Sequence, residues 1–167
     1  MSDYTVEEEL REVHVRFAIA ASYGQGLESL GVSLLKLSAQ ARIPDADLET
    51  LDSALARRTL GQLLKDVSRE VGLDESAQEV LSLGLEKRNY LVHRFFEASA
   101  EKMYSATGRA SCIAELREIA LVLQSAHEVL QRLVDAYFEK GWSKEALHQL
   151  KAATRVATLG AEVDLDA

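Results

Sequence analysis

The chain has 167 residues, of which 47% are hydrophobic and 28% are charged, and this length and balance predict one globular domain spanning residues 1–167. Its single cysteine, Cys112, excludes an internal disulfide framework, and its formal net charge of −8 is opposite in sign to that of a general nucleic-acid binder. The N-terminus is acidic and lacks the basic and apolar regions of a secretory signal, so we expect a cytoplasmic protein.

The first predicted helix covers residues 5–40, where apolar and small side chains recur at alternating spacings of four and three. Thr5 is placed to cap it, and the acidic run that follows suits the positive end of a helix dipole. Gly24 and Gly31 lie on the apolar stripe, so we expect a neighbouring helix to approach closely there. Glycine also weakens a helix, which leaves open a kink around residues 23–26. Polar residues interrupt the apolar run, so no membrane span is expected.

Pro44 ends this helix, because proline disfavours helical geometry at the residue before it. The next helical segment is predicted over residues 47–71. Its apolar period slips by one residue around residues 57–61, which indicates either one bent helix or two short ones. Gly72 suits a helix C-cap and separates this segment from the next.

A central helix is predicted over residues 76–104, and a second heptad stripe predicts another helix over residues 109–140. His127 interrupts that second stripe, and we interpret it as a core or interface residue. The apolar side chains that share an arc on the central helix form its predicted buried stripe. They are Leu81, Leu85, Val92, Phe96 and Met103.

A short C-terminal helix is predicted over residues 144–157, with Trp142 as its anchor, and residues 158–167 are expected to form a frayed tail. The sequence contains no strand pattern, no glycine-rich phosphate loop and no metal-ligand spacing such as HxxxH or CxxC. We therefore expect no metal and no cofactor. The predicted fold is all-α, an up-down helical bundle of four main helices plus the short C-terminal one.

Arg88, Asn89 and His93 concentrate the polar chemistry of the central helix. Placing an arginine and an asparagine beside a buried stripe costs desolvation energy unless they are paired. A histidine takes and returns a proton near neutral pH, and an arginine offers a permanent bidentate charge to a phosphate. These residue types are sufficient for metal-independent RNA cleavage, with Asn89 orienting its neighbours or the phosphate. Lys87 and Arg94 flank them and are predicted to bind RNA.

Arg88 and His93 point about 140° apart on an ideal helix, so one helix does not easily aim both at one point. The reach of the arginine side chain, or a second copy of the helix, would close that gap. A second copy would also supply a second histidine for an acid–base pair. The alternative interpretation is a salt-bridge network with Glu86, Glu97 or an acid on a neighbouring helix.

The six residues from Arg88 to His93 resemble the Rx4-6H motif of the HEPN superfamily (higher eukaryotes and prokaryotes nucleotide-binding), in which a polar residue often follows the arginine. The resemblance implies a helical bundle that forms a homodimer, with two motif helices facing each other across a composite site. It also implies an RNA-cleaving toxin or antiviral-defence effector, with an antitoxin or regulatory protein as a partner. In HEPN toxins that are silenced by a nucleotidyltransferase, a tyrosine commonly stands two residues after the histidine, and here that residue is Phe95.

Two other classes of function stay open. One is a non-catalytic HEPN-like module that binds a nucleotide, RNA or a protein, which suits the acidic surface. The other is a structural interaction protein that uses the two heptad stripes. Cleavage of RNA, as opposed to binding alone, distinguishes the nuclease from both of these classes.

Overall fold

The computed structural model describes residues 5–43 and 46–141, and every regular element within them is a helix. The elements are, in chain order, α1 (Val6–Arg42), α2 (Leu48–Leu55), α3 (Leu60–Val71), α4 (Glu75–His93), α5 (Phe95–Ser99), the 3₁₀ helix η1 (Glu101–Tyr104) and α6 (Ala106–Gly141). The prediction of an all-α chain is confirmed for this part of the molecule. None of these helices combines the length and the apolar character that a membrane span needs. The short helix and tail predicted after residue 141 lie outside the described residues.

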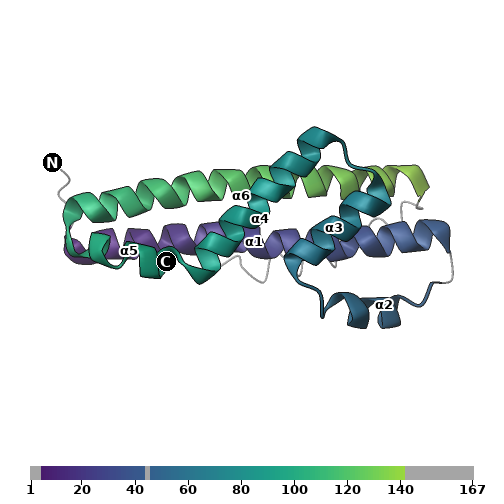
Figure 1. Cartoon of the computed structure of the whole chain (residues 1–167), viewed down its shortest axis with the longest axis horizontal. Coiled ribbons are helices and arrows are strands. Elements are labelled where there is room, and N and C mark those ends of the chain that lie inside the picture. The colour runs from purple at the N-terminus through teal and green to yellow at the C-terminus, as the bar shows by residue number, and fades with distance from the viewer. Residues whose placement is uncertain (1–4, 44–45, 142–167) are drawn as a thin grey trace, which may run out of the picture.

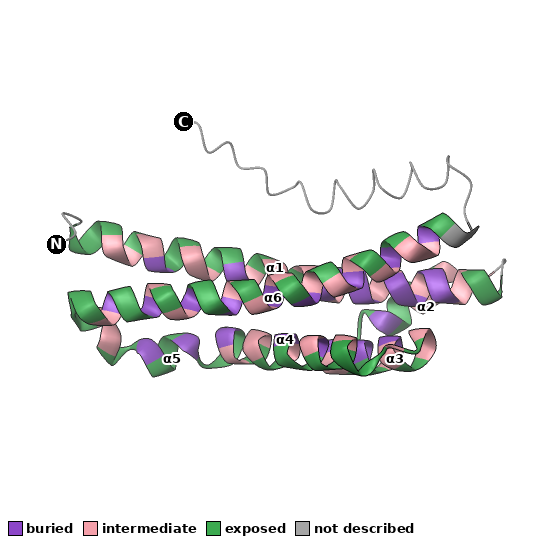
Figure 2. Ribbon diagram, turned by 90° about the horizontal axis from the view of Figure 1, so that it is seen from above, coloured by how far each residue is buried: buried purple, intermediate pink, exposed green. Residues whose placement is uncertain are grey.

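α1 and α6 form a long pair, and α3, α4 and α5 lie over one face of it (Figures 1 and 2). The two long helices run in the same direction, because Glu9 pairs with Arg109 near their starts and Tyr23 contacts His127 farther along. In a simple up-down bundle of four helices, the first and the last would run antiparallel. That part of the predicted arrangement is therefore wrong.

The extra reversal of the chain comes from the segment predicted over residues 47–71, which forms two helices. α2 packs beside the end of α1, and α3 then follows α1 in the same direction. Leu63 faces Gly31 across that contact, and Glu70 pairs with Arg42 at 2.7 Å. The slip in the apolar period thus marks a change of chain direction, and not a bend.

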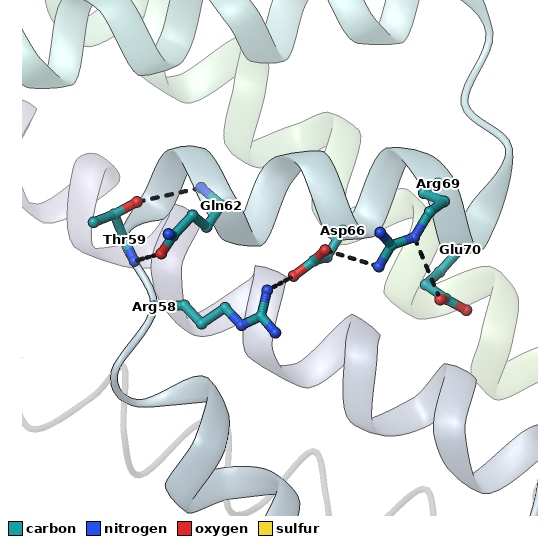
Figure 3. A network of polar contacts seen from close by, with 6 residues as sticks. All are labelled: Arg58, Thr59, Gln62, Asp66, Arg69 and Glu70. Carbon is teal, nitrogen blue, oxygen red and sulfur yellow. Dashed lines mark hydrogen bonds and ion pairs between the residues drawn. The ribbon is translucent and has the colours of Figure 1, made fainter.

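Local polar contacts fix the start of α3, as Figure 3 shows. Thr59 and Gln62 exchange the two hydrogen bonds of a capping box, which satisfies N–H groups that the first helical turn leaves free. Farther along, Asp66 accepts hydrogen bonds from Arg58 at 2.6 Å and from Arg69 at 2.9 Å. These contacts tie the residues before α3 to the helix itself.

α1 is continuous, without the kink that its glycines left open. The predicted cap at Thr5 is present as a capping box. Gly24 and Gly26 lie at close crossings, one toward α4 and the other toward α6. The small residues therefore serve the approach of neighbouring helices, as predicted for Gly24, and do not interrupt α1.

The predicted central helix over residues 76–104 ends early, at His93. Arg94 leaves helical geometry, with φ −133° and ψ −21°, and α5 and η1 follow as separate pieces. α6 begins at Ala106, earlier than predicted, and Gly108 therefore lies in its first turn. A Cβ at Gly108 would lie 2.0 Å from the carbonyl oxygen of Lys102, so this passage of the chain requires glycine.

The break after α4 changes which side chains are buried. Leu91 and Phe95 are 1% and 0% exposed, whereas Val92 and Phe96, which were predicted to be buried, are 50% and 43% exposed. Phe96 lies over Phe17 of α1, with ring centroids 4.7 Å apart. Two exposed apolar side chains therefore remain beside the C-terminal end of α4.

His127 is half-buried, with its ring against Gly26 and edge-on to Tyr23 at a centroid distance of 6.0 Å. Burial lowers the pKa of its imidazole, and Glu128 offsets this only in part. The imidazole of His127 therefore takes up its proton at a higher pH in the unfolded chain than in the folded protein. The stability that His127 contributes is present above its ordinary pKa of about 6.5 and is lost as the pH falls through the lowered value.

We therefore expect the urea concentration at the unfolding midpoint of the wild-type protein to decrease when the pH is lowered from about 7.5 to about 5.5. The same change of pH should lower the midpoint of the His127→Gln variant by less, because glutamine does not titrate. Urea unfolding followed by circular dichroism measures both values. Equal losses in the two proteins would contradict the role given to His127.

Candidate functional site

The C-terminal half of α4 and the start of α3 border an open pocket of about 860 Å³. Four of the residues singled out from the sequence line it, namely Arg88, Asn89, His93 and Arg94. The other lining residues come from the same two helices and the residue before α3. They are Thr59, Leu60, Gly61, Leu85, Glu86 and Tyr90. The fold thus brings the three predicted catalytic side chains to the wall of one cavity.

Arg88 is held between α1 and α4. Its Nη2 forms an ion pair with Glu28 of α1, and its Nη1 donates to Oδ1 of Asn89 at 3.3 Å. The side chains of Arg88 and Glu28 are 24% and 40% exposed, so water reaches the pair. The salt bridge to an acid on a neighbouring helix, which the alternative interpretation expected, is therefore present at Arg88.

His93 and Arg94 lie at the exposed end of α4. His93 is the last residue of the helix, and Arg94 is its C-cap, whose N–H donates to the carbonyl oxygen of Tyr90 at 2.8 Å. Neither side chain has a hydrogen bond or an ion pair within residues 5–43 and 46–141. Both are therefore accessible to a ligand that enters the pocket from solvent.

Lys87 lies on the other flank of α4, at a second pocket of about 380 Å³. There Tyr90 donates to Glu115 at 2.7 Å, and Lys102 donates to the same carboxylate at 3.1 Å. The hydrogen bond to Glu115 and burial raise the pKa of Tyr90 to about 12. Burial works to raise the pKa of Glu115, but the bonds from Tyr90 and Lys102 lower it overall. The two residues predicted to bind RNA, Lys87 and Arg94, are thus divided between two faces.

Glu28 and the start of α3 were not among the candidates singled out from the sequence. Glu28 stands one turn after Gly24 inside an apolar run, and a charge in such a run is the signal that points to it. Thr59 and Gly61 carry no comparable signal. They border the pocket because α3 packs on α4, where a Cβ at Gly61 would lie 3.3 Å from Cδ2 of Leu85.

No group of three or more histidine, cysteine, aspartate or glutamate side chains converges as a metal site in the described part of the chain. Comparison with known proteins yields no relative, since no family model, no curated protein and no solved structure matches this sequence. The pocket and the residues that line it are therefore the observations that bear on function.

Proposed function

We propose that this protein is a metal-independent endoribonuclease of HEPN type, which acts as a homodimer in a toxin or a phage-defence system. The observation that carries the proposal is the pocket that Arg88, Asn89 and His93 line together. An arginine and an exposed histidine on one wall supply the two functions that RNA cleavage needs, charge stabilisation and proton transfer.

In this mechanism the 2′-hydroxyl oxygen of a ribose attacks the adjacent phosphorus as the bond to the 5′-oxygen breaks. His93 accepts the proton of the 2′-hydroxyl or donates one to the leaving oxygen. Arg88 stabilises the negative charge that builds on the oxygens of the phosphorus centre. Asn89 accepts a hydrogen bond from Arg88 and so helps to orient the guanidinium. The products end in a 2′,3′-cyclic phosphate and a 5′-hydroxyl.

A second copy of the chain completes the acid–base pair, because one histidine fills only one of the two proton-transfer roles. Val92 and Phe96 are exposed on either side of His93, and the ring of His14 stacks on Phe96 at a centroid distance of 5.8 Å. Both apolar side chains are about half exposed beside the C-terminal end of α4, where a contact between two copies of the chain would cover them. A two-fold-related copy that covers this surface would bring a second His93 toward the pocket.

A non-catalytic HEPN-like module is the second candidate, and the ion pair between Arg88 and Glu28 favours it. The carboxylate neutralises the arginine that the nuclease mechanism assigns to the phosphate. The volume of the pocket, about 860 Å³, lies within the range of small-molecule sites. In this alternative the pocket binds a nucleotide or an RNA segment without cutting it, or the module binds a protein partner.

The deciding experiment incubates a broad panel of RNAs with the wild-type chain and with His93→Ala, in EDTA and at matched dimer concentration. We expect the variant to cleave about 100-fold more slowly or not at all, because general acid–base catalysis contributes at least that factor. Glu79→Ala is the control, since Glu79 is an exposed residue of the same helix that does not line the pocket. Cleavage that persists in His93→Ala would remove this residue from the mechanism. A wild-type dimer that binds RNA and cuts none would establish the binding module instead.

A further inference from the structure

Glu28 contacts Arg88 from a different helix and from outside the pocket. It lies on α1, its carboxylate forms an ion pair with Nη2 of Arg88, and it is not among the lining residues. Arg88 therefore contacts α1 through its guanidinium and is at the same time one of the residues that line the pocket. A carboxylate in that place acts on the arginine and does not need to touch a ligand.

Gly24 fixes the other end of the same side chain. It precedes Glu28 by one turn on α1, and a Cβ at this position would lie 3.1 Å from Cγ and 3.9 Å from Cβ of Arg88. The stem of the arginine thus runs directly over the backbone of α1. Together, Gly24 at the stem and Glu28 at the head determine the course of the Arg88 side chain from α4 across α1.

The hydrogen-bonding capacity of Arg88 is only partly used by these contacts. A guanidinium has five N–H donors in a fixed plane. One donor on Nη2 serves Glu28 and one on Nη1 serves Asn89. The other three have no bond partner among the described residues, and the two bonds fix the orientation of the guanidinium plane. An arginine that is ordered before substrate binds loses less conformational freedom in the transition state.

We propose that Glu28 is a positioning residue, which holds the guanidinium of Arg88 in the orientation that receives the phosphate of the RNA. The inference rests on the proposed nuclease function. In the wild-type protein the carboxylate prevents the arginine from rotating away, and its charge keeps a half-buried cation in place. Glu28 acts through Arg88 alone, so its effect on cleavage depends on the presence of that arginine.

The test compares RNA cleavage by wild type, Glu28→Gln, Arg88→Ala and the double variant, each over a range of RNA concentrations that reaches saturation. We expect Glu28→Gln to lower kcat about tenfold, because it removes one charge-assisted hydrogen bond. KM should stay unchanged or fall, since a negative charge beside the pocket is lost. In the Arg88→Ala background the same change should have no further effect. Glu12→Gln is the matched control, because Glu12 also lies on α1 in a half-exposed ion pair with an arginine, Arg16, at 2.7 Å.

A second measurement follows the orientation of Arg88 independently of cleavage. The nitrogen-15 signals of its guanidinium should show hindered rotation in the wild type and faster rotation in Glu28→Gln. Unchanged kcat in Glu28→Gln, multiplicative losses in the double variant, or equally hindered rotation in both proteins would overturn the role of Glu28. If the wild-type dimer cuts no RNA, the nuclease function fails first, and the cleavage role of Glu28 fails with it.

Discussion

Replacing Arg109 with alanine is expected to lower the melting temperature by roughly 10 °C, the largest loss of stability that we expect from replacing one charged residue within the described part of the chain. The Arg109 side chain is only 6% exposed. It donates to Glu9 at 2.7 Å and to the carbonyl oxygen of Met103 at 2.9 Å, and so joins α6 to α1 and to η1. Alanine leaves the carboxylate of Glu9, 17% exposed, without its counter-charge, and breaking a buried pair costs about 3–5 kcal/mol.

Differential scanning calorimetry of two further variants separates this effect from a general effect of charge. Arg117→Ala, on the same helix, should lose less than about 1 kcal/mol, because Arg117 is 58% exposed and lies 3.9 Å from Glu12. Removing both buried partners, in Glu9→Gln with Arg109→Met, should recover much of the stability, since no unpaired buried charge remains. A loss in Arg109→Ala no larger than that in Arg117→Ala would show that the buried pair does not hold the helix ends together.

Helix content and several helix ends were predictable, because they depend on residues close in sequence. The Thr5 cap forms with a residue three positions away, and Gly72 adopts the left-handed geometry, with φ 68°, that suits a glycine C-cap. The two long helices follow from heptad stripes that extend over many turns. In each case the chemistry that decides the structure lies within a few residues of the element it shapes.

The direction of the helices and the end of α4 were not predictable in the same way. A slip in the apolar period between residues 57 and 61 fits a bend and a reversal equally well, and only the packing of α3 on α1 decides between them. At Arg94, the periodic pattern continues through Phe95 and Phe96 although the helix ends. The break at Arg94 changes the phase of the side chains, so that Phe95 is buried in the core and Phe96 contacts Phe17 of α1, and this tertiary packing is not visible in the local pattern.

In the candidate site, too, some features depend on residues close in sequence and others depend on tertiary packing. On an ideal helix Arg88 and His93 point about 140° apart, yet both of them line one pocket together with Asn89. Glu28 lies 60 positions from Arg88, and its contact depends on the crossing of α1 and α4. A sequence can indicate that a half-buried arginine needs an acid, but the partner is chosen by the tertiary fold.

Replacing Arg88 with alanine is expected to reduce RNA cleavage by at least about 100-fold, if the proposed nuclease function holds, because a donor aimed at transition-state charge contributes on that scale. Arg88→Lys should recover only part of the rate, since a lysine cannot donate bidentately to a phosphate or span Glu28 and Asn89 in one plane. Single-turnover cleavage of a labelled RNA measures both variants, and Arg117→Ala serves as the control for loss of a positive charge outside the pocket.

The stability of Arg88→Ala distinguishes a site residue from a structural one. Glu28 is 40% exposed, so water can solvate it when the arginine is removed, and we expect the melting temperature to change by only about 2–4 °C. Arg109 and Arg88 both pair with a glutamate of α1, yet the first is buried and the second borders an open pocket. If Arg88→Ala lost as much stability as Arg109→Ala, its lost cleavage would be explained by unfolding. Lost cleavage in a folded dimer would instead place Arg88 at the reacting phosphate.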